Sequence, residues 1–311
     1  MLKAVIDDEI AGDPMSDQKW VRRSLVYLAQ ILCKRGYQIG PTTVRRLLRK
    51  LGYGLFGNRQ SLTSRHPDRD KQFRFIRRMR KLFMATGRPV ISVDAKKKEL
   101  IGNFKNGGRA WGQSPTQVKV HDFGSEAVGR ATPYGIYDLT HNQGYVYVGA
   151  SADTPAFAAH AIAQWWADPN RPRFALEDKL LILCDAGGSN SCRYWQWKIQ
   201  VQQQLADQFG IEVIICHYPT GASKWNPIEH RLFSEISKNW SGKPLRTFQT
   251  MLNYIQGTTT TVRLKVKAFL VERVFEKGLK YDWHDRKNLN LQRFRSCPTW
   301  NYRIKPCCCS G

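Results

Sequence analysis

The sequence has no long uninterrupted apolar stretch. No segment reaches the roughly 18 apolar residues that a membrane helix needs, and the longest apolar runs, such as 180–184, have the length of a buried strand. The first nine residues include three acidic residues at 7–9 and lack the apolar core of a signal peptide. We therefore expect a soluble, intracellular protein with no membrane partner.

Cysteines in zinc-binding patterns are also missing. None of the eight cysteines forms a C-x-x-C pair, and the adjacent residues Cys307, Cys308 and Cys309 cannot easily surround one tetrahedral ion. The others lie mostly within or beside apolar segments, as reduced thiols do inside cells. We expect neither a zinc site nor a disulfide framework.

Acidic residues are scarce. The 311 residues include 25 Asp and Glu against 49 Lys and Arg, a net charge of +24. Such a surface requires a polyanionic partner, most commonly nucleic acid, with an anionic membrane surface or ribosomal RNA as the alternative. Residues 21–88 hold 18 of the basic residues and only Asp68 and Asp70, which makes +16 of the total. The first third of the chain is therefore expected to contact the polyanion.

Two short amphipathic helices are predicted in this basic third. One repeats apolar residues at helical spacing over 21–32 and ends before Gly36; the other runs from Pro41 to Gly52. Helices joined by such a tight turn are typical of a helix-turn-helix, whose second helix lies in the DNA major groove, although a generic helical hairpin is the alternative. The basic face of the second helix supplies the candidate DNA contacts Arg45, Arg46, Arg49 and Lys50.

From Pro89 onwards the pattern changes to short strands alternating with helices. Three early strands followed by helix, strand, helix, strand and helix predict an α/β fold: a ribonuclease H-like mixed sheet with flanking helices, preceded by a small all-α helix-turn-helix domain. The predicted strands and helices are 90–93, 134–139, 145–148, 154–166, 180–184, 191–209, 211–216 and 226–240. The predicted regions are a helix-turn-helix over 1–66, a basic linker helix over 67–88, the catalytic domain over 89–262 and a C-terminal extension over 263–311.

Three carboxylates stand at informative places in this predicted domain. Asp94 and Asp185 each end a strand, and Glu229 lies in the first turn of the last helix. Neighbouring parallel strands end at one edge of a sheet, so these side chains can converge, and clustered carboxylates are tolerated where divalent cations neutralise them. Two Mg²⁺ or Mn²⁺ ions would then serve phosphoryl transfer. Each residue also has a structural explanation: turn formation for the aspartates, and a capping box that begins at Asn226 for Glu229.

Three sequence blocks around these carboxylates carry a specific resemblance. Residues 94–103, 184–190 and 217–230 resemble the signature blocks of the ISAzo-type insertion-sequence transposases, also called the Rhodopirellula-type DDE family. The likeness extends from about residue 12 to residue 302. It implies that Asp94, Asp185 and Glu229 form the catalytic and metal-binding triad, and that the fold is the ribonuclease H-like one.

The chain departs from the family pattern in a few places. Ala95 and Ala186 stand where the family often has Thr and Ser, and Pro227 stands where it often has Lys; none of these changes removes a ligand. Members also tend to be longer at the N-terminus, and residues 307–311 resemble nothing in the family. A truncated or inactive copy is therefore an alternative to an active enzyme.

Other residues around the blocks suggest DNA contacts. Lys96 and Lys97 beside Asp94, and Lys224 ahead of Glu229, are positioned to hold phosphates, with a solvated lysine run as the alternative. Trp225 is interpreted as a core residue, with stacking on a base as the alternative. His217 and His230 are interpreted as hydrogen-bonded structural histidines, with a ligand role as the alternative.

These inferences combine into one functional hypothesis. The resemblance implies a bacterial, cytoplasmic and nucleoid-associated DNA transposase that cleaves element ends and joins their 3′-OH groups to target DNA. Its partners would be double-stranded DNA, both inverted repeats and target, and a second copy in a homodimer. The alternatives are a catalytically inactive remnant or DNA-binding repressor, and a ribonuclease H-like nuclease acting on other substrates.

Overall fold

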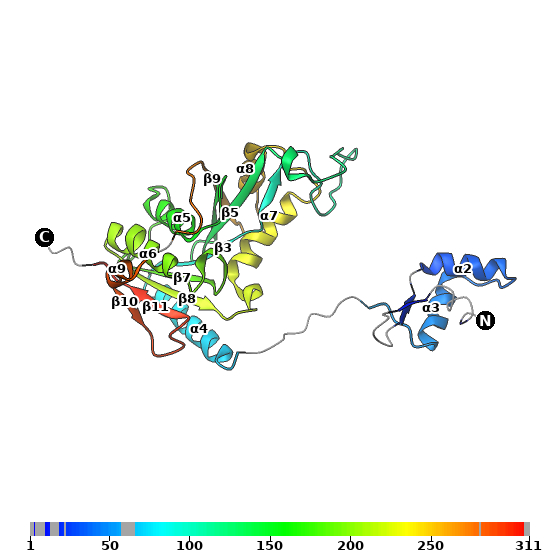
Figure 1. The fold of residues 1–311 in the computed structure, drawn as a ribbon, viewed down its shortest axis with the longest axis horizontal. Helices are drawn as coiled ribbons and strands as arrows, with labels where there is room; N and C mark the ends of the chain where they lie inside the picture. Colours follow the sequence, from blue (N-terminus) through cyan, green and yellow to red (C-terminus); the bar gives the residue numbers. More distant parts are fainter. Residues whose placement is uncertain are drawn as a thin grey trace. The chain divides into compact units, whose positions relative to one another are not determined.

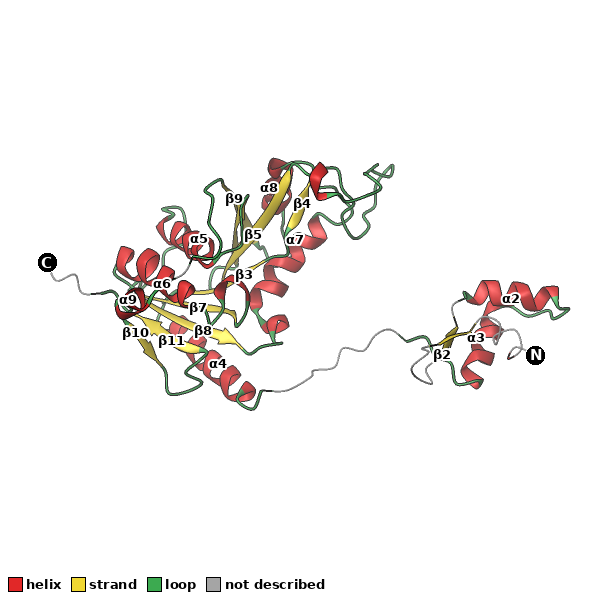
Figure 2. Ribbon diagram, in the orientation of Figure 1, coloured by secondary structure: helices red, strands yellow, loops and turns green. Residues whose placement is uncertain are grey.

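The computed structural model describes residues 3, 10–12, 19–21, 23–56, 66–279 and 281–307. The chain folds into two compact units, Met1–Thr63 and Ser64–Gly311. Figure 1 traces the chain by sequence position and Figure 2 by secondary structure. Among the helices described, none is long and apolar enough to cross a bilayer.

The first unit contains the two predicted helices. They are α2 (Leu25–Lys34) and α3 (Pro41–Lys50), which pack through an apolar cluster centred on Leu28, Leu32 and Val44. Gly36 and Gly52 follow the helices with φ of 88° and 84°, a left-handed conformation that glycine adopts without strain. The unit also has a short antiparallel strand pair that the sequence analysis did not predict, β1 (Ile10–Gly12) and β2 (Lys19–Val21).

The second unit is built on a nine-stranded mixed sheet. Its strand order is β10-β11-β8-β7-β3-β5-β6-β9, with β4 paired to β5 outside this path. Central β3 runs parallel to β7 and antiparallel to β5, and β7 runs parallel to β8, which is the predicted ribonuclease H-like arrangement. The strands are β3 (Val90–Ala95), β4 (Glu99–Ile101), β5 (Gly129–Asp138), β6 (Gln143–Gly149), β7 (Lys179–Asp185), β8 (Glu212–Tyr218), β9 (Lys265–Val271), β10 (Leu291–Arg293) and β11 (Asn301–Ile304).

Helices cover both faces of this sheet, as Figure 2 shows. Because side chains alternate along a strand, Ile182 packs under α5 and α6, whereas Leu181 and Leu183 pack under α4 on the other face. The helices α7 and α8 cover β5, β6 and β9. The helices are α4 (Arg69–Ala85), α5 (Pro155–Ala167), α6 (Trp195–Val201), α7 (Ser234–Asn239), α8 (Phe248–Gln256) and α9 (Trp283–Lys287).

Two predicted boundaries differ from the structure. The helix α4 is not a linker, because Phe75, Ile76, Met79 and Phe83 are buried against β3, β7 and β8. The part of the predicted extension that contains β9 and β11 belongs to the sheet. The strand β9 pairs with β6 over seven residue pairs, and β11 pairs with β8, so the sheet is complete only with this segment.

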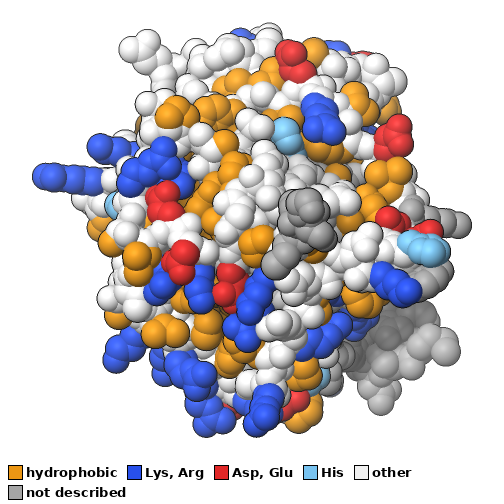
Figure 3. All heavy atoms as spheres, turned by 90° about the vertical axis from the view of Figure 1, so that its left-hand side faces the viewer, with side chains coloured by type: hydrophobic (Ala, Val, Ile, Leu, Met, Phe, Trp, Pro, Cys, Tyr) orange, Lys and Arg blue, Asp and Glu red, His pale blue; other side chains and the backbone are white. Residues whose placement is uncertain are grey.

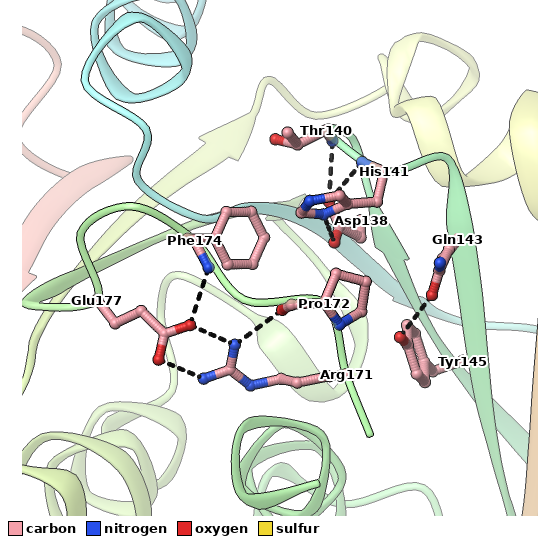
Figure 4. A network of polar contacts seen from close by, with 9 residues as sticks. All are labelled: Asp138, Thr140, His141, Gln143, Tyr145, Arg171, Pro172, Phe174 and Glu177. Atoms are coloured by element: carbon pink, nitrogen blue, oxygen red, sulfur yellow. Dashed lines mark hydrogen bonds and ion pairs between the residues drawn. The ribbon is translucent and has the colours of Figure 1, made fainter. Parts of the chain in front are cut away.

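A polar network closes the edge of the sheet at which β5 ends (Figure 4). Asp138 is fully buried and accepts hydrogen bonds from the backbone N–H groups of Thr140 and His141 at 2.8 and 3.1 Å. The buried guanidinium of Arg171 pairs with Glu177 at 2.7 Å. Both acids at this edge therefore have close polar partners.

Candidate active site

Asp94 and Asp185 lie side by side at the carboxyl ends of neighbouring strands. The parallel register of β3 and β7 pairs Val93 with Cys184, and each aspartate follows directly in its strand. The strand order therefore places the two aspartates at one edge of the sheet. Burial is partial at both positions, so the carboxylates can still be reached from solvent.

Asn226, in the third sequence block (residues 217–230), forms hydrogen bonds with both of these strands. Its side chain is fully buried, and its Nδ2 donates a 3.1 Å hydrogen bond to Oδ1 of Asp185. Its Oδ1 accepts a hydrogen bond from the Ser92 hydroxyl on β3, which in turn accepts the backbone N–H of Ile228 at 3.1 Å. Asn226 thus connects the sheet edge to the start of the helix that carries Glu229 and does not provide a side-chain helix cap.

Glu229 begins a π-helical turn, Glu229–Phe233, that continues into α7. π-Helical turns inside helices occur often at functional sites. The turn packs closely on β5, because a Cβ at Gly135 would come within 2.5 Å of the Phe233 ring and 2.8 Å of the Ile228 side chain. Gly135 is the register partner of Asp94. A side chain at this position would therefore press against the turn that carries Glu229.

The charges of the three carboxylates act on one another. Burial and then the charge of Asp185 raise the pKa of Asp94 to about 8, with a further contribution from Glu229. Burial also raises the pKa of Asp185 to about 6, against the hydrogen bond from Asn226, and the charge of Glu229 adds to this rise. Buried like charges without a cation produce this pattern.

A fourth acidic residue, Asp153, belongs to the same neighbourhood. It lies between β6 and the N-cap residue of α5, and its charge contributes to the raised pKa of Asp94. Among the described residues, none makes a hydrogen bond to its buried Oδ1. Sequence analysis missed Asp153, because an aspartate just before a helix is typical of a turn or cap.

The donor chemistry of this site suits a hard divalent cation. Carboxylate oxygens are the ligands that Mg²⁺ and Mn²⁺ prefer, and burial together with the neighbouring negative charges raises the pKa of both aspartates. As the side chains stand, however, no three Asp, Glu, His or Cys residues in the described part of the chain are close enough together to hold a metal ion. The residue types and their charges therefore suit a divalent cation, although the described side chains do not converge on one point.

Comparison with known proteins now decides the family. The sequence pattern of the family described as "Rhodopirellula transposase DDE domain" matches residues 1–306. The chain belongs to this family. It is thus a DNA transposase with a DDE catalytic domain, and the resemblance predicted from the three sequence blocks is confirmed.

Other comparisons give distant likenesses. Among the curated proteins, none matches the transposase. The solved structure of the Mos1 Strand Transfer Complex is similar, with a TM-score of 0.44 and 13% sequence identity. The structure of the Mos1 mariner paired end complex with Mn has a TM-score of 0.42 and 12% sequence identity. In both, the alignment covers 82% of this chain and 68% of the other.

The predicted DNA contacts of the transposase have different surroundings. Lys96 is largely buried, 3.5 Å from Glu99 and over the Trp240 ring at 5.0 Å. Lys97 and Lys224 are exposed. In the first unit Arg45, Arg46, Arg49 and Lys50 are all exposed on α3.

Aromatic and histidine residues near the third block complete the site. The prediction of a core Trp225 was wrong, since its side chain is 55% exposed. His217 is fully buried, and its ring nitrogens lie 3.0 Å from the Asp185 carbonyl oxygen and 3.0 Å from the Tyr302 hydroxyl. Burial lowers the pKa of His217 to about 4, so it is a neutral, structural histidine at physiological pH.

Proposed function

We propose that the transposase hydrolyses phosphodiesters at the ends of its own element and joins the freed 3′-OH groups to target DNA. Asp94, Asp185 and Glu229 are the proposed catalytic residues, and together they would hold two Mg²⁺ or Mn²⁺ ions. The observation that carries this proposal is the side-by-side placement of two partly buried aspartates whose pKa values are both raised.

The protein's own residues prepare this chemistry. Bound cations would activate the attacking water or 3′-OH and stabilise the leaving 3′-oxygen. The side-chain amide of Asn226 donates a hydrogen bond to Oδ1 of Asp185, which leaves the other carboxylate oxygen of Asp185 for a ligand. Asp94, with a pKa of about 8, is mostly protonated at pH 7 and would release its proton when a cation binds to the carboxylate.

DNA contacts are proposed for both units. The exposed basic residues of α3 suit the major groove of the element ends, and Lys97 and Lys224 suit phosphates near the carboxylates. Lys96 would bind phosphate only after leaving Glu99. Because two element ends must be processed together, we propose that the protein acts as a homodimer, associated with DNA in the bacterial nucleoid.

The test is Mn²⁺-dependent nicking of a duplex that carries the element's terminal repeat. Asp94→Ala, Asp185→Ala and Glu229→Ala should each reduce nicking to background, while binding of the same duplex persists. If the triple variant cuts as well as the parent, the assignment of the site is wrong.

A DNA-binding repressor that has lost catalysis is the alternative function. A repressor would bind the terminal-repeat duplex equally well with and without Mn²⁺ and would nick it under neither condition.

A further inference from the structure

A cavity lies apart from the carboxylates, between the loop after β7 and the β10–β11 hairpin. Its volume is about 480 Å³. Three of its lining residues are cationic, and none of them is acidic, although all are described. The lining residues are Cys192, Arg193, Trp195, Lys198, Arg293, Pro298 and Thr299.

Lys198 is the unusual member of this set. Its side chain is only 2% exposed, and its Nζ donates a 2.6 Å hydrogen bond to the carbonyl oxygen of Cys192. The ammonium also lies over the rings of Trp195 and Tyr302 at 4.8 and 5.4 Å. Buried lysines are usually paired with a carboxylate. Here no acid among the described residues forms an ion pair with Lys198, and burial followed by the charge of Arg293 lowers the pKa of Lys198 to about 8.

The cavity is close to the catalytic edge of the sheet. The Tyr302 ring that Lys198 faces carries a hydroxyl 3.0 Å from Nε2 of His217. The other ring nitrogen of His217 lies 3.0 Å from the backbone oxygen of Asp185. Two side chains therefore connect Lys198 with a proposed metal ligand.

We propose that this cavity binds a backbone phosphate of the DNA that enters the active site, with Arg193, Lys198 and Arg293 as its cations. The inference rests on the proposed function, because it assigns the anion to the DNA substrate. The guanidinium groups of Arg193 and Arg293 can each donate two hydrogen bonds to phosphate oxygens, and the ammonium of Lys198 adds a third positive charge. Bound phosphate would also supply the negative charge that Lys198 lacks.

A neighbouring cavity favours a polyanion over a single small anion. It lies on the other side of the β10–β11 hairpin, against α4, and has a volume of about 530 Å³. Arg295 belongs to this second cavity and Arg293 to the first, so the hairpin offers cations on both sides. Lys and Arg side chains also gather in the lower part of the face seen in Figure 3, the level at which Figure 1 places β10, β11 and α4. The second cavity is lined by Lys71, Arg74, Phe75, Arg78, Phe294, Arg295 and Ser296.

The experiment compares two double variants of the full chain. Arg193→Gln with Arg293→Gln removes the two exposed cations of the first cavity. Lys265→Gln with Lys277→Gln removes the same charge from β9 and the residues after it, at the opposite edge of the sheet. Binding to a duplex of element-end sequence is measured by fluorescence anisotropy at several NaCl concentrations.

The cavity variant should bind about tenfold more weakly, and its slope of log K against log[NaCl] should be smaller in magnitude by about 1, since one neutralised phosphate contributes about 0.9. The β9 variant should keep the parental slope. Equal slopes for the parent and the cavity variant would overturn the proposal.

Inorganic phosphate provides a second measurement. At matched ionic strength, phosphate in place of chloride should raise the melting temperature of the parent but not of the cavity variant or of Lys198→Met. If phosphate protects only the parent while DNA binding is the same in all variants, the site takes free phosphate and the DNA assignment fails. A parent that binds DNA through this cavity but never nicks it would instead refute the proposed catalysis and leave this inference intact.

Discussion

Asp94 and Asp185 carry like charges on adjacent parallel strands, and this placement costs stability when no cation is bound. An unfolded aspartate has a pKa near 3.9, whereas Asp94 in the fold has a pKa of about 8. Between these values the folded state holds the extra proton. The stability gained from this protonation is therefore complete at low pH and is lost as the pH rises towards 8.

Asp94→Asn should remove this pH dependence. Urea unfolding in EDTA should show the parent losing on the order of 2 kcal/mol between pH 5 and pH 8, after discounting for partial exposure and coupling. The variant should lose clearly less, because its amide does not ionise. An equal loss in both proteins would contradict the raised pKa of Asp94.

Asp153 provides a second residue-scale prediction. Its charge raises the pKa of Asp94, so Asp153→Asn should lower that pKa. Carboxyl carbon chemical shifts followed by NMR through a pH titration would measure the change in the metal-free protein. Asp122→Asn, an exposed control, should leave the pKa of Asp94 unaltered. The same titration midpoint for Asp94 in Asp153→Asn as in the parent would argue against Asp153 as a neighbour of the site.

At the scale of secondary-structure elements, the buried side chain of Asn226 connects β3, β7 and the helix that carries Glu229. Asn226→Ala would leave the Ser92 hydroxyl and Asp185 without their partner, at a cost of about 2 kcal/mol. We expect lower stability in urea and weaker Mn²⁺ binding, because Glu229 would lose its fixed approach to the aspartates. Asn253→Ala, on the exposed side of α8, should change neither quantity. Weakened stability with unchanged Mn²⁺ binding would show that Asn226 is structural only.

Element prediction from sequence succeeded where apolar periodicity was clear. The strands that carry Asp94 and Asp185, and the basic helices of the first unit, lie where alternation and helical spacing indicated. The strands β10 and β11 were missed because they have only three and four residues, too few to establish a period. The strand β9 was missed because its membership in the sheet depends on pairing with β6, about 120 residues earlier.

Side-chain roles were harder to predict, since local sequence does not determine long-range partners. Asn226 follows the pattern of a helix cap, but its actual partners are Ser92 and Asp185, brought to it by the sheet. Lys198 sits in an ordinary amphipathic segment, and only the fold shows that it is buried without an acid. The exposure of Trp225 likewise depends on how the third block packs on the sheet.

At the scale of the whole molecule, the net charge of +24 and the carboxylate site have complementary roles. The exposed cations on α3 and around the two hairpin cavities would attract a polyanion, whereas the three proposed catalytic carboxylates would hold the cations. A DNA transposase requires this combination, because its substrate and its metal ions have opposite charges.

Calorimetric titration of Mn²⁺ into the metal-free protein at pH 8 tests the central claim most directly. The comparison is with Asp94→Asn/Asp185→Asn/Glu229→Gln, which removes three negative charges with little change in shape and should remain folded. The parent should bind two ions per chain, and the triple variant should bind none while retaining its affinity for duplex DNA. Equal Mn²⁺ binding by both proteins would contradict a metal site built from these three carboxylates.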